Sequence, residues 1–170
     1  MRRIHCLIIS VCLAGCASVE PVADALPPLD VSKTNFGMFV GVGPGVEARL
    51  ADEAAKQLWE TYPPQKNLLD FQQRIAEADS FGRRLMVALQ RNGYFVHQWH
   101  DPVVAPQCGQ GTDEAKSGEY RRVPVCYLVD DVSGMLRLTL YAAGEAWSRF
   151  FNTEQGKLVP VGAWSRQSGR

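Results

Sequence analysis

The sequence predicts an α+β domain in which two amphipathic helices pack on one face of a mainly antiparallel sheet of about 4–6 strands. Two observations lead to this prediction. Apolar residues recur with a helical period in the first half of the chain and with a strand period of two in the second half. Because the predicted strands follow one another closely, hairpin turns and antiparallel pairing are expected.

The first predicted helix covers residues 46–62. Its apolar residues recur at every fourth position while charged residues take the other faces, which is the pattern of an amphipathic helix: Leu50, Ala54, Leu58 and Tyr62. Pro63-Pro64 ends this helix, because a proline disfavours helical backbone in the residue before it. Residues 67–71 are then predicted to form a short strand.

A second helix is expected after Asp79 or Ser80, since either residue can cap an N-terminus. Its apolar stripe consists of Phe81, Leu85 and Leu89. Asn92-Gly93 provides the left-handed stop that commonly ends a helix. Residues 94–99 follow as a predicted strand.

The C-terminal part of the chain contains a series of strand patterns separated by polar or glycine-containing turns. Strands are predicted at residues 123–129, 136–141, 146–151 and 158–164, with turns at residues 130–134, 143–145 and 152–157. Pro160 cannot donate a hydrogen bond to a neighbouring strand, so we expect the last strand to lie at a sheet edge.

The strand at residues 146–151 has aromatic side chains on alternate positions. Ala146, Ser148 and Phe150 are expected to point inward, which places Trp147 and Phe151 on the other face. Two interpretations of Trp147 and Phe151 stay open. Either helices cover them, or they form a protein-docking surface, which makes them candidate partner-binding residues.

The N-terminus contains two arginines, a short apolar run and small residues, as an export signal does. The apolar run at residues 4–13 is about half the length that a membrane-spanning helix needs. Leu13-Ala14-Gly15-Cys16 resembles the lipobox of bacterial lipoproteins, in which the cysteine carries lipid. We expect residues 1–15 to be a signal peptide and Cys16 to be lipidated. An ordinary secretory signal with a chance cysteine is the alternative.

Residues 16–45 are expected to be a lipidated N-terminus and flexible tether, followed by a single periplasmic domain at residues 46–166. Ala17 is not the aspartate associated with retention at the inner membrane, so the expected location is the outer membrane, facing the periplasm. The tether ends in an apolar segment, residues 36–42. Extended apolar segments can add to the edge of a partner's sheet, so its candidate partner-binding residues are Phe36, Phe39 and Val40.

The charge and the motifs argue against two classes of function. Loss of residues 1–15 would remove two of the 18 basic residues and none of the 18 acidic ones, which gives no electrostatic reason to bind nucleic acid. No spacing suits a nucleophile with its base, a pair of catalytic carboxylates or a metal cluster. Asp130-Asp131 is interpreted as turn chemistry. We therefore expect no enzymatic activity, no catalytic residue, no metal and no cofactor.

Cys108 and Cys126 form an even pair once the leader is removed and Cys16 carries lipid. In an oxidising compartment this predicts a disulfide between them. The alternatives are free thiols, or a zinc site that adds His97 and His100 to the two cysteines. Because His97 and His100 are three residues apart in a predicted strand, they would point in opposite directions, which argues against zinc.

Several stretches together resemble the TrbH lipoproteins of plasmid conjugal-transfer, or mating-pair formation, systems. Besides the lipobox, these stretches are 54–58 with Tyr62-Pro63-Pro64, Phe81-Gly82 with Leu85 and Leu89, Gly93-Tyr94-Phe95-Val96, Arg137-Leu138-Thr139-Leu140 with Ser148-Arg149, and Gly162-Ala163-Trp164-Ser165-Arg166. The resemblance covers residues 46–166 and the leader, and excludes the loop at residues 102–120.

The resemblance implies a structural component of a type IV secretion envelope complex and no enzyme. Its partners would be the secretion-core proteins of the conjugal transfer apparatus, in a multi-subunit ring complex, with the membrane reached through the lipid. A different class of function is a stand-alone envelope lipoprotein of the periplasm that binds a small ligand or cell wall.

Overall fold

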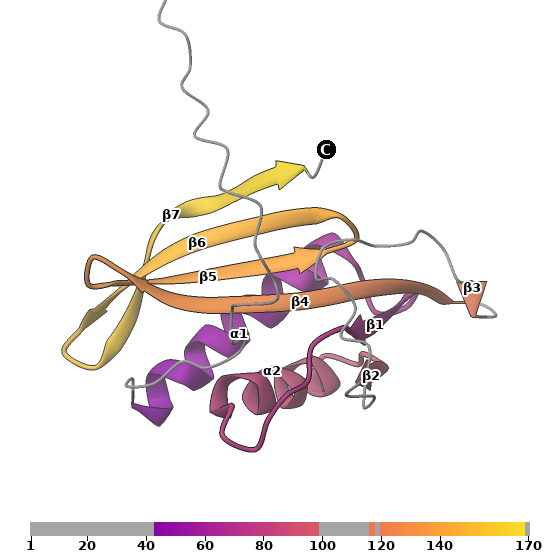
Figure 1. The fold of residues 1–170 in the computed structure, drawn as a ribbon, viewed down its shortest axis with the longest axis horizontal. Coiled ribbons are helices and arrows are strands. Elements are labelled where there is room, and N and C mark those ends of the chain that lie inside the picture. Colours follow the sequence, from indigo (N-terminus) through magenta and orange to yellow (C-terminus); the bar gives the residue numbers. More distant parts are fainter. Residues whose placement is uncertain (1–42, 99–115, 118–119, 169–170) are drawn as a thin grey trace, which may run out of the picture.

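The computed structural model describes residues 43–98, 116–117 and 120–168. They form two helices and a mixed sheet, so the predicted α+β class is confirmed (Figure 1). The helices are α1 (Pro44–Thr61) and α2 (Ser80–Arg91). The strands are β1 (Asn67–Phe71), β2 (Val96–Gln98), β3 (Lys116–Ser117), β4 (Tyr120–Val132), β5 (Met135–Ala142), β6 (Glu145–Glu154) and β7 (Lys157–Ser168). Their order in the sheet is β2-β1-β4-β5-β6-β7, and β3 pairs with β4.

Both helices form where the apolar periodicity predicts them. α1 begins at Pro44, two residues earlier than expected, because proline is tolerated in the first turn of a helix. Asp79 caps α2 by accepting a hydrogen bond of 2.8 Å from the backbone N–H of Gly82. Gly93, just beyond α2, has a φ of +84°, which a glycine adopts without steric cost.

The sheet is mostly antiparallel, but β1 lies between two parallel neighbours, β2 and β4. The parallel pairing of β1 with β2 follows from α2, which returns the chain to the starting edge before β2 begins. β2 begins two residues later than the predicted strand at residues 94–99, and residue 99 lies outside the described residues. Tyr94 instead turns into the core and donates a 2.7 Å hydrogen bond to the carbonyl of Tyr62, at the end of α1.

Three two-residue turns join β4, β5, β6 and β7. Both residues of each turn have a positive φ: Ser133-Gly134, Ala143-Gly144 and Gln155-Gly156. Such turns match the natural twist of a hairpin and fix the register of the strands beside them. They are tighter than predicted, so Asp130 and Asp131 belong to β4, although the side chain of Asp131 still accepts a 2.9 Å hydrogen bond from the Gly134 N–H.

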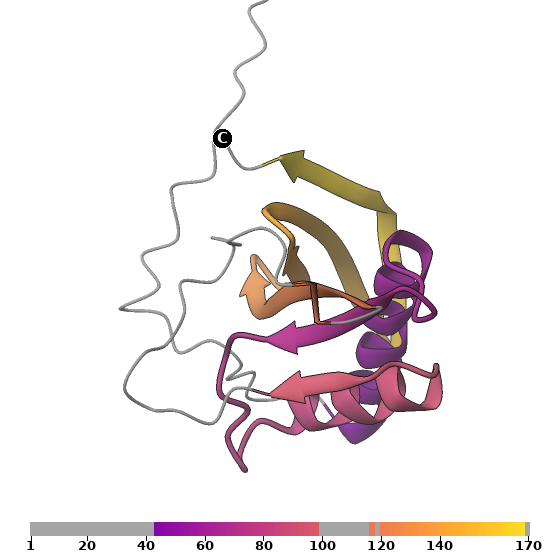
Figure 2. The same ribbon diagram turned by 90° about the vertical axis from the view of Figure 1, so that its right-hand side faces the viewer.

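One hydrophobic core unites both helices with alternate strand residues. Tyr127 of β4 pairs with Leu140 of β5, which pairs with Trp147 of β6, so all three point to the same face of the sheet. Tyr127 contacts Phe81 of α2, and Trp147 contacts Tyr62 just after α1, in edge-to-face ring contacts. Figure 2 shows the two helices beside each other and next to the strands.

Candidate functional site at the free edge of the sheet

Five of the residues predicted to act in anchoring, bridging or docking lie outside the described residues: Cys16, Phe36, Phe39, Val40 and Cys108. The lipid anchor and the strand-adding segment at residues 36–42 therefore stay predictions. The remaining three, Cys126, Trp147 and Phe151, are in the sheet.

Cys126 is buried in β4 and is disulfide-bonded. Its predicted partner, Cys108, is outside the described residues, so that pairing stays a prediction. A disulfide-bonded cysteine has no thiolate to offer a metal, which removes Cys126 from the alternative zinc set. His97 of that set lies with its Nδ1 2.7 Å from Oδ1 of Asp70, and His100 is outside the described residues.

The docking surface predicted at Trp147 and Phe151 needs correction. Trp147 is 5% exposed and Phe151 is fully buried, so both belong to the core. The other residues of this strand, Ala146, Ser148 and Phe150, were expected to point inward but take the opposite, partly exposed face. Both faces of β6 carry apolar side chains, so their alternation alone does not fix which face is buried.

The free edge of β7 is the feature best placed to contact another protein. β7 ends the strand order, and within residues 43–98, 116–117 and 120–168 no strand pairs with its outer edge. Val159 and Val161 are 37% and 42% exposed. An exposed edge presents unpaired backbone N–H and C=O groups and accepts a strand from another chain.

The two halves of β7 differ in how open they are. Pro160 interrupts the first half, as the sequence predicts for an edge strand, because it has no N–H to donate. Gly162 follows with a φ of +74°, next to a register shift in the pairing of β6 with β7. Residues 163–168 then continue as strand to the end of β7. The second half is the open part of the edge.

The open half is fixed to β6 by side-chain contacts. The ring of Trp164 packs edge-to-face on Phe151 at a centroid distance of 6.4 Å. The hydroxyl of Ser165 donates a 3.0 Å hydrogen bond to the carbonyl of Ser148, and Arg166 forms an ion pair with Glu145. Anchoring of this kind orders the strand before a partner arrives, which lowers the entropic cost of binding.

Arg149 of β6 links this part of the sheet to α1. Its guanidinium donates hydrogen bonds of 3.0 Å to the carbonyl of Gly162 and 3.1 Å to Glu53. Arg149 thus pairs with Glu53 of α1, whereas Arg166 pairs with Glu145 within the sheet.

A family model described as "Conjugal transfer protein TrbH" matches residues 33–168 of the chain. The chain belongs to the TrbH family. The match spans every described helix and strand, from α1 to β7. It also extends through residues 36–42, ahead of α1. Searches of curated proteins and of solved structures give no match for this TrbH protein.

TrbH membership makes this a conjugal transfer protein, and such a protein is consistent with a location in the cell envelope. Neither helix in the part of the chain that the structure describes is long and apolar enough to cross a membrane. Among the same residues, no group of three or more His, Cys, Asp or Glu side chains is placed to hold a metal ion.

Proposed function

We propose that this TrbH protein is a structural subunit of the envelope complex of a conjugative type IV secretion system, where it docks other subunits and performs no catalysis. Its membership of a conjugal transfer family supports a place in the transfer apparatus. The open half of β7, at residues 163–168, is the single structural observation that carries the docking role.

Strand addition is the form of docking that this edge favours. Six residues of strand span about 20 Å, which is enough for several backbone hydrogen bonds with a partner strand. Proteins normally protect long open edges, since they promote aggregation. β7 carries Pro160 in only one half, so the other half is left for a specific partner, here a secretion-core protein of a multi-subunit ring.

The proposal includes a lipid on Cys16 that attaches the protein to the outer membrane, with its folded domain in the periplasm. One acyl chain binds a membrane only weakly, so stable attachment needs more than one chain on this cysteine. The attachment raises the effective concentration of the domain near membrane-bound partners. A disulfide between Cys108 and Cys126 would form in this oxidising compartment.

The proposal also includes the segment at residues 36–42. Its apolar residues Phe36, Phe39 and Val40 would add as a strand to the sheet of a partner. The protein would then contact two neighbouring subunits: the edge of β7 would accept a strand from one, and residues 36–42 would add to the sheet of the other. Contacts of this head-to-tail kind form closed rings when their rotation closes.

Affinity purification from envelopes tests the proposal. The tagged protein is extracted in mild detergent from cells that carry the complete transfer system, and the co-purifying proteins are identified. We expect secretion-core subunits with native Cys16, fewer with Cys16→Ser, and fewer when Phe36, Phe39 and Val40 are replaced by Ser. A Lys157→Ser variant, altered at an exposed residue outside the open half of β7, is the control and should behave as wild type.

Recovery of the protein alone, from native and altered forms equally, would contradict the assembly role. It would favour the stand-alone envelope lipoprotein that binds a small ligand or cell wall.

A further inference from the structure

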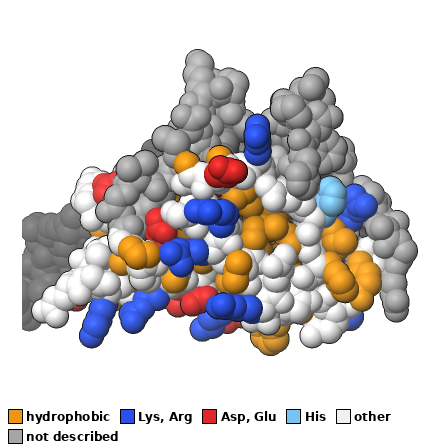
Figure 3. Space-filling view, turned by 90° about the horizontal axis from the view of Figure 1, so that it is seen from below, with side chains coloured by type: hydrophobic (Ala, Val, Ile, Leu, Met, Phe, Trp, Pro, Cys, Tyr) orange, Lys and Arg blue, Asp and Glu red, His pale blue; other side chains and the backbone are white. Residues whose placement is uncertain are grey.

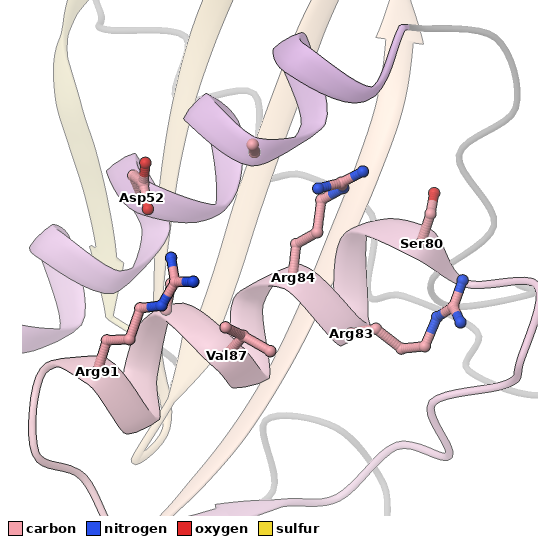
Figure 4. A pocket seen from close by; sticks show the side chains of 8 residues that line it. Asp52, Ser80, Arg83, Arg84, Val87 and Arg91 are labelled. Carbon is pink, nitrogen blue, oxygen red and sulfur yellow. The ribbon is translucent and has the colours of Figure 1, made fainter.

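A groove of about 360 Å³ lies between the two helices, on a different part of the molecule from β7 (Figure 4). It is lined by Ala48 and Asp52 of α1 and by Ser80, Arg83, Arg84, Val87, Ala88 and Arg91 of α2. Figure 3 shows basic side chains beside hydrophobic ones on the lower face of the molecule, where α2 lies in Figure 1. The groove therefore combines positive charge with apolar surface.

The two helices that form the groove run in the same direction. The first turns of α1 and α2 are joined by Glu47 with Ser80, and their ends are joined by Tyr62 with Tyr94. Helices side by side leave a furrow along their common length, into which the side chains of a third helix fit. The shape of the groove thus favours a helical occupant.

The α2 wall of the groove has an excess of positive charge. α2 contains three arginines and no acidic residue. Arg84 pairs with Glu47, whereas Arg83 and Arg91 form no ion pair with any residue that the structure describes. Only Asp52 among the lining residues is acidic. The groove can therefore accept further carboxylates.

Arg84 is held in position before any partner binds. Glu47, only 7% exposed, accepts a 2.6 Å hydrogen bond from the hydroxyl of Ser80 and a 3.3 Å hydrogen bond from Nε of Arg84. The terminal amino groups of Arg84 have no partner in the described part of the chain. They stay available for a carboxylate, which an arginine binds through two parallel hydrogen bonds.

An apolar contact site lies between Arg84 and Arg91. Val87, 45% exposed, lies three residues after Arg84 and four before Arg91, so all three share one face of α2. Figure 4 shows Arg84 and Arg91 extending toward α1 on either side of Val87. The arginines are seven residues apart, about 10.5 Å along the helix axis. Charge, apolar surface and charge therefore follow one another over two turns of α2.

We propose that the groove docks an acidic amphipathic helix of another protein. Carboxylates two turns apart on that helix pair with Arg84 and Arg91, and apolar side chains between them pack on Val87. The partner sequence therefore has acidic residues at positions i and i+7 and Leu, Ile or Met at i+3 and i+4. A membrane surface fits less well, because a furrow between two helices accepts the side chains of a third helix better than it accepts a flat surface.

A labelled synthetic helix with Glu at i and i+7 and Leu at i+3 and i+4 tests the proposal by fluorescence anisotropy with the full chain in detergent. Arg91→Glu should weaken its binding by about tenfold, equal to about 1.4 kcal/mol. A peptide with Lys at i+7 should restore binding to Arg91→Glu, which also shows that this variant is folded. Arg74→Glu, an exposed arginine outside the groove, is the matched control and should bind as wild type does.

Three results would overturn the proposal. The first is equal binding of a peptide with Gln in place of both Glu residues. The second is equal weakening by Arg91→Glu and Arg74→Glu. The third is that the wild type binds phosphatidylglycerol vesicles but not the peptide, and that Arg91→Glu no longer binds the vesicles. That result would assign the groove between α1 and α2 to the membrane.

Discussion

The hydroxyl of Tyr127, at the centre of β4, donates a hydrogen bond to Oδ2 of Asp79, the residue that caps α2. The other carboxylate oxygen of Asp79 accepts the backbone N–H of Gly82. Both side chains are buried. One carboxylate therefore fixes the start of α2 on the middle of the sheet.

Gly82 leaves the space that the Tyr127 hydroxyl occupies. A Cβ at position 82 would overlap that hydroxyl and would lie 2.8 Å from Asp79 Oδ2 and 2.9 Å from Ile75 Cγ2. We expect Gly82→Ala to lower the free energy of unfolding by about 1–3 kcal/mol, as overpacking does. Gly45→Ala is the control, because a Cβ at Gly45 meets nothing within 4 Å. Equal stability of the two variants in urea unfolding would contradict this arrangement.

Tyr127→Phe removes the hydroxyl and leaves the ring. We expect a loss of about 1–3 kcal/mol, since Asp79 would lose its buried donor. Gly82→Ala should then cost less in the Tyr127→Phe background than in the wild type, because the main overlap is gone. A double-mutant cycle in urea measures this coupling, and strictly additive effects would show that the two residues do not meet.

Burial raises the pKa of Asp79 above its ordinary value, and the hydrogen bonds from Tyr127 and Gly82 only partly oppose this effect. The folded state thus holds the proton more tightly than the unfolded state. This contribution to stability is fully present below the ordinary pKa of about 4 and is lost as the pH rises through the raised pKa. In Asp79→Asn the free energy of unfolding should no longer fall as the pH rises through this range, because asparagine does not titrate. Urea unfolding across the pH range compares the two, and parallel stability curves would contradict the prediction.

Trp147 and Trp59 form a matched pair that separates core from surface. Trp147 packs on Tyr62 inside the core, and Trp59 of α1 is 48% exposed. Trp147→Ala should cost about 3–5 kcal/mol of unfolding free energy, whereas Trp59→Ala should change it by about 0.5 kcal/mol or less. A Trp147→Ala variant of normal stability that loses its partners would instead restore the docking surface predicted from the sequence.

The elements that depend on local pattern follow directly from the sequence. Apolar residues at every fourth position from Leu50 to Leu58 predict α1, and the cap at Asp79 predicts the start of α2. Pro160 predicts that β7 lies at an edge of the sheet. The parallel pairing of β1 depends on contacts between distant segments, such as Leu69 with Val123, for which no local pattern exists. Sequence reasoning for this reason overestimates the antiparallel character of the sheet.

The candidate sites, too, could be predicted from the sequence only in part. An edge at β7 is predictable from Pro160, but the open half beyond Gly162 depends on a register shift that only the structure shows. The arginines of α2 have the spacing of an ordinary solvated helix face, so sequence reasoning missed the groove. What makes them a candidate site is Glu47, 37 residues before Arg84 in the chain.

Proline substitution at Arg166 and Gln167 tests the central claim, docking through the open half of β7, most directly. Consecutive residues of a strand direct their N–H groups to opposite edges, so one proline removes a hydrogen bond to β6 and the other removes a donor at the free edge. The variant that keeps wild-type stability identifies the free-edge position. We expect that variant to lose the co-purifying core subunits and to lower conjugal transfer at least about tenfold. Wild-type transfer and wild-type recovery of subunits by that same variant would contradict docking through β7.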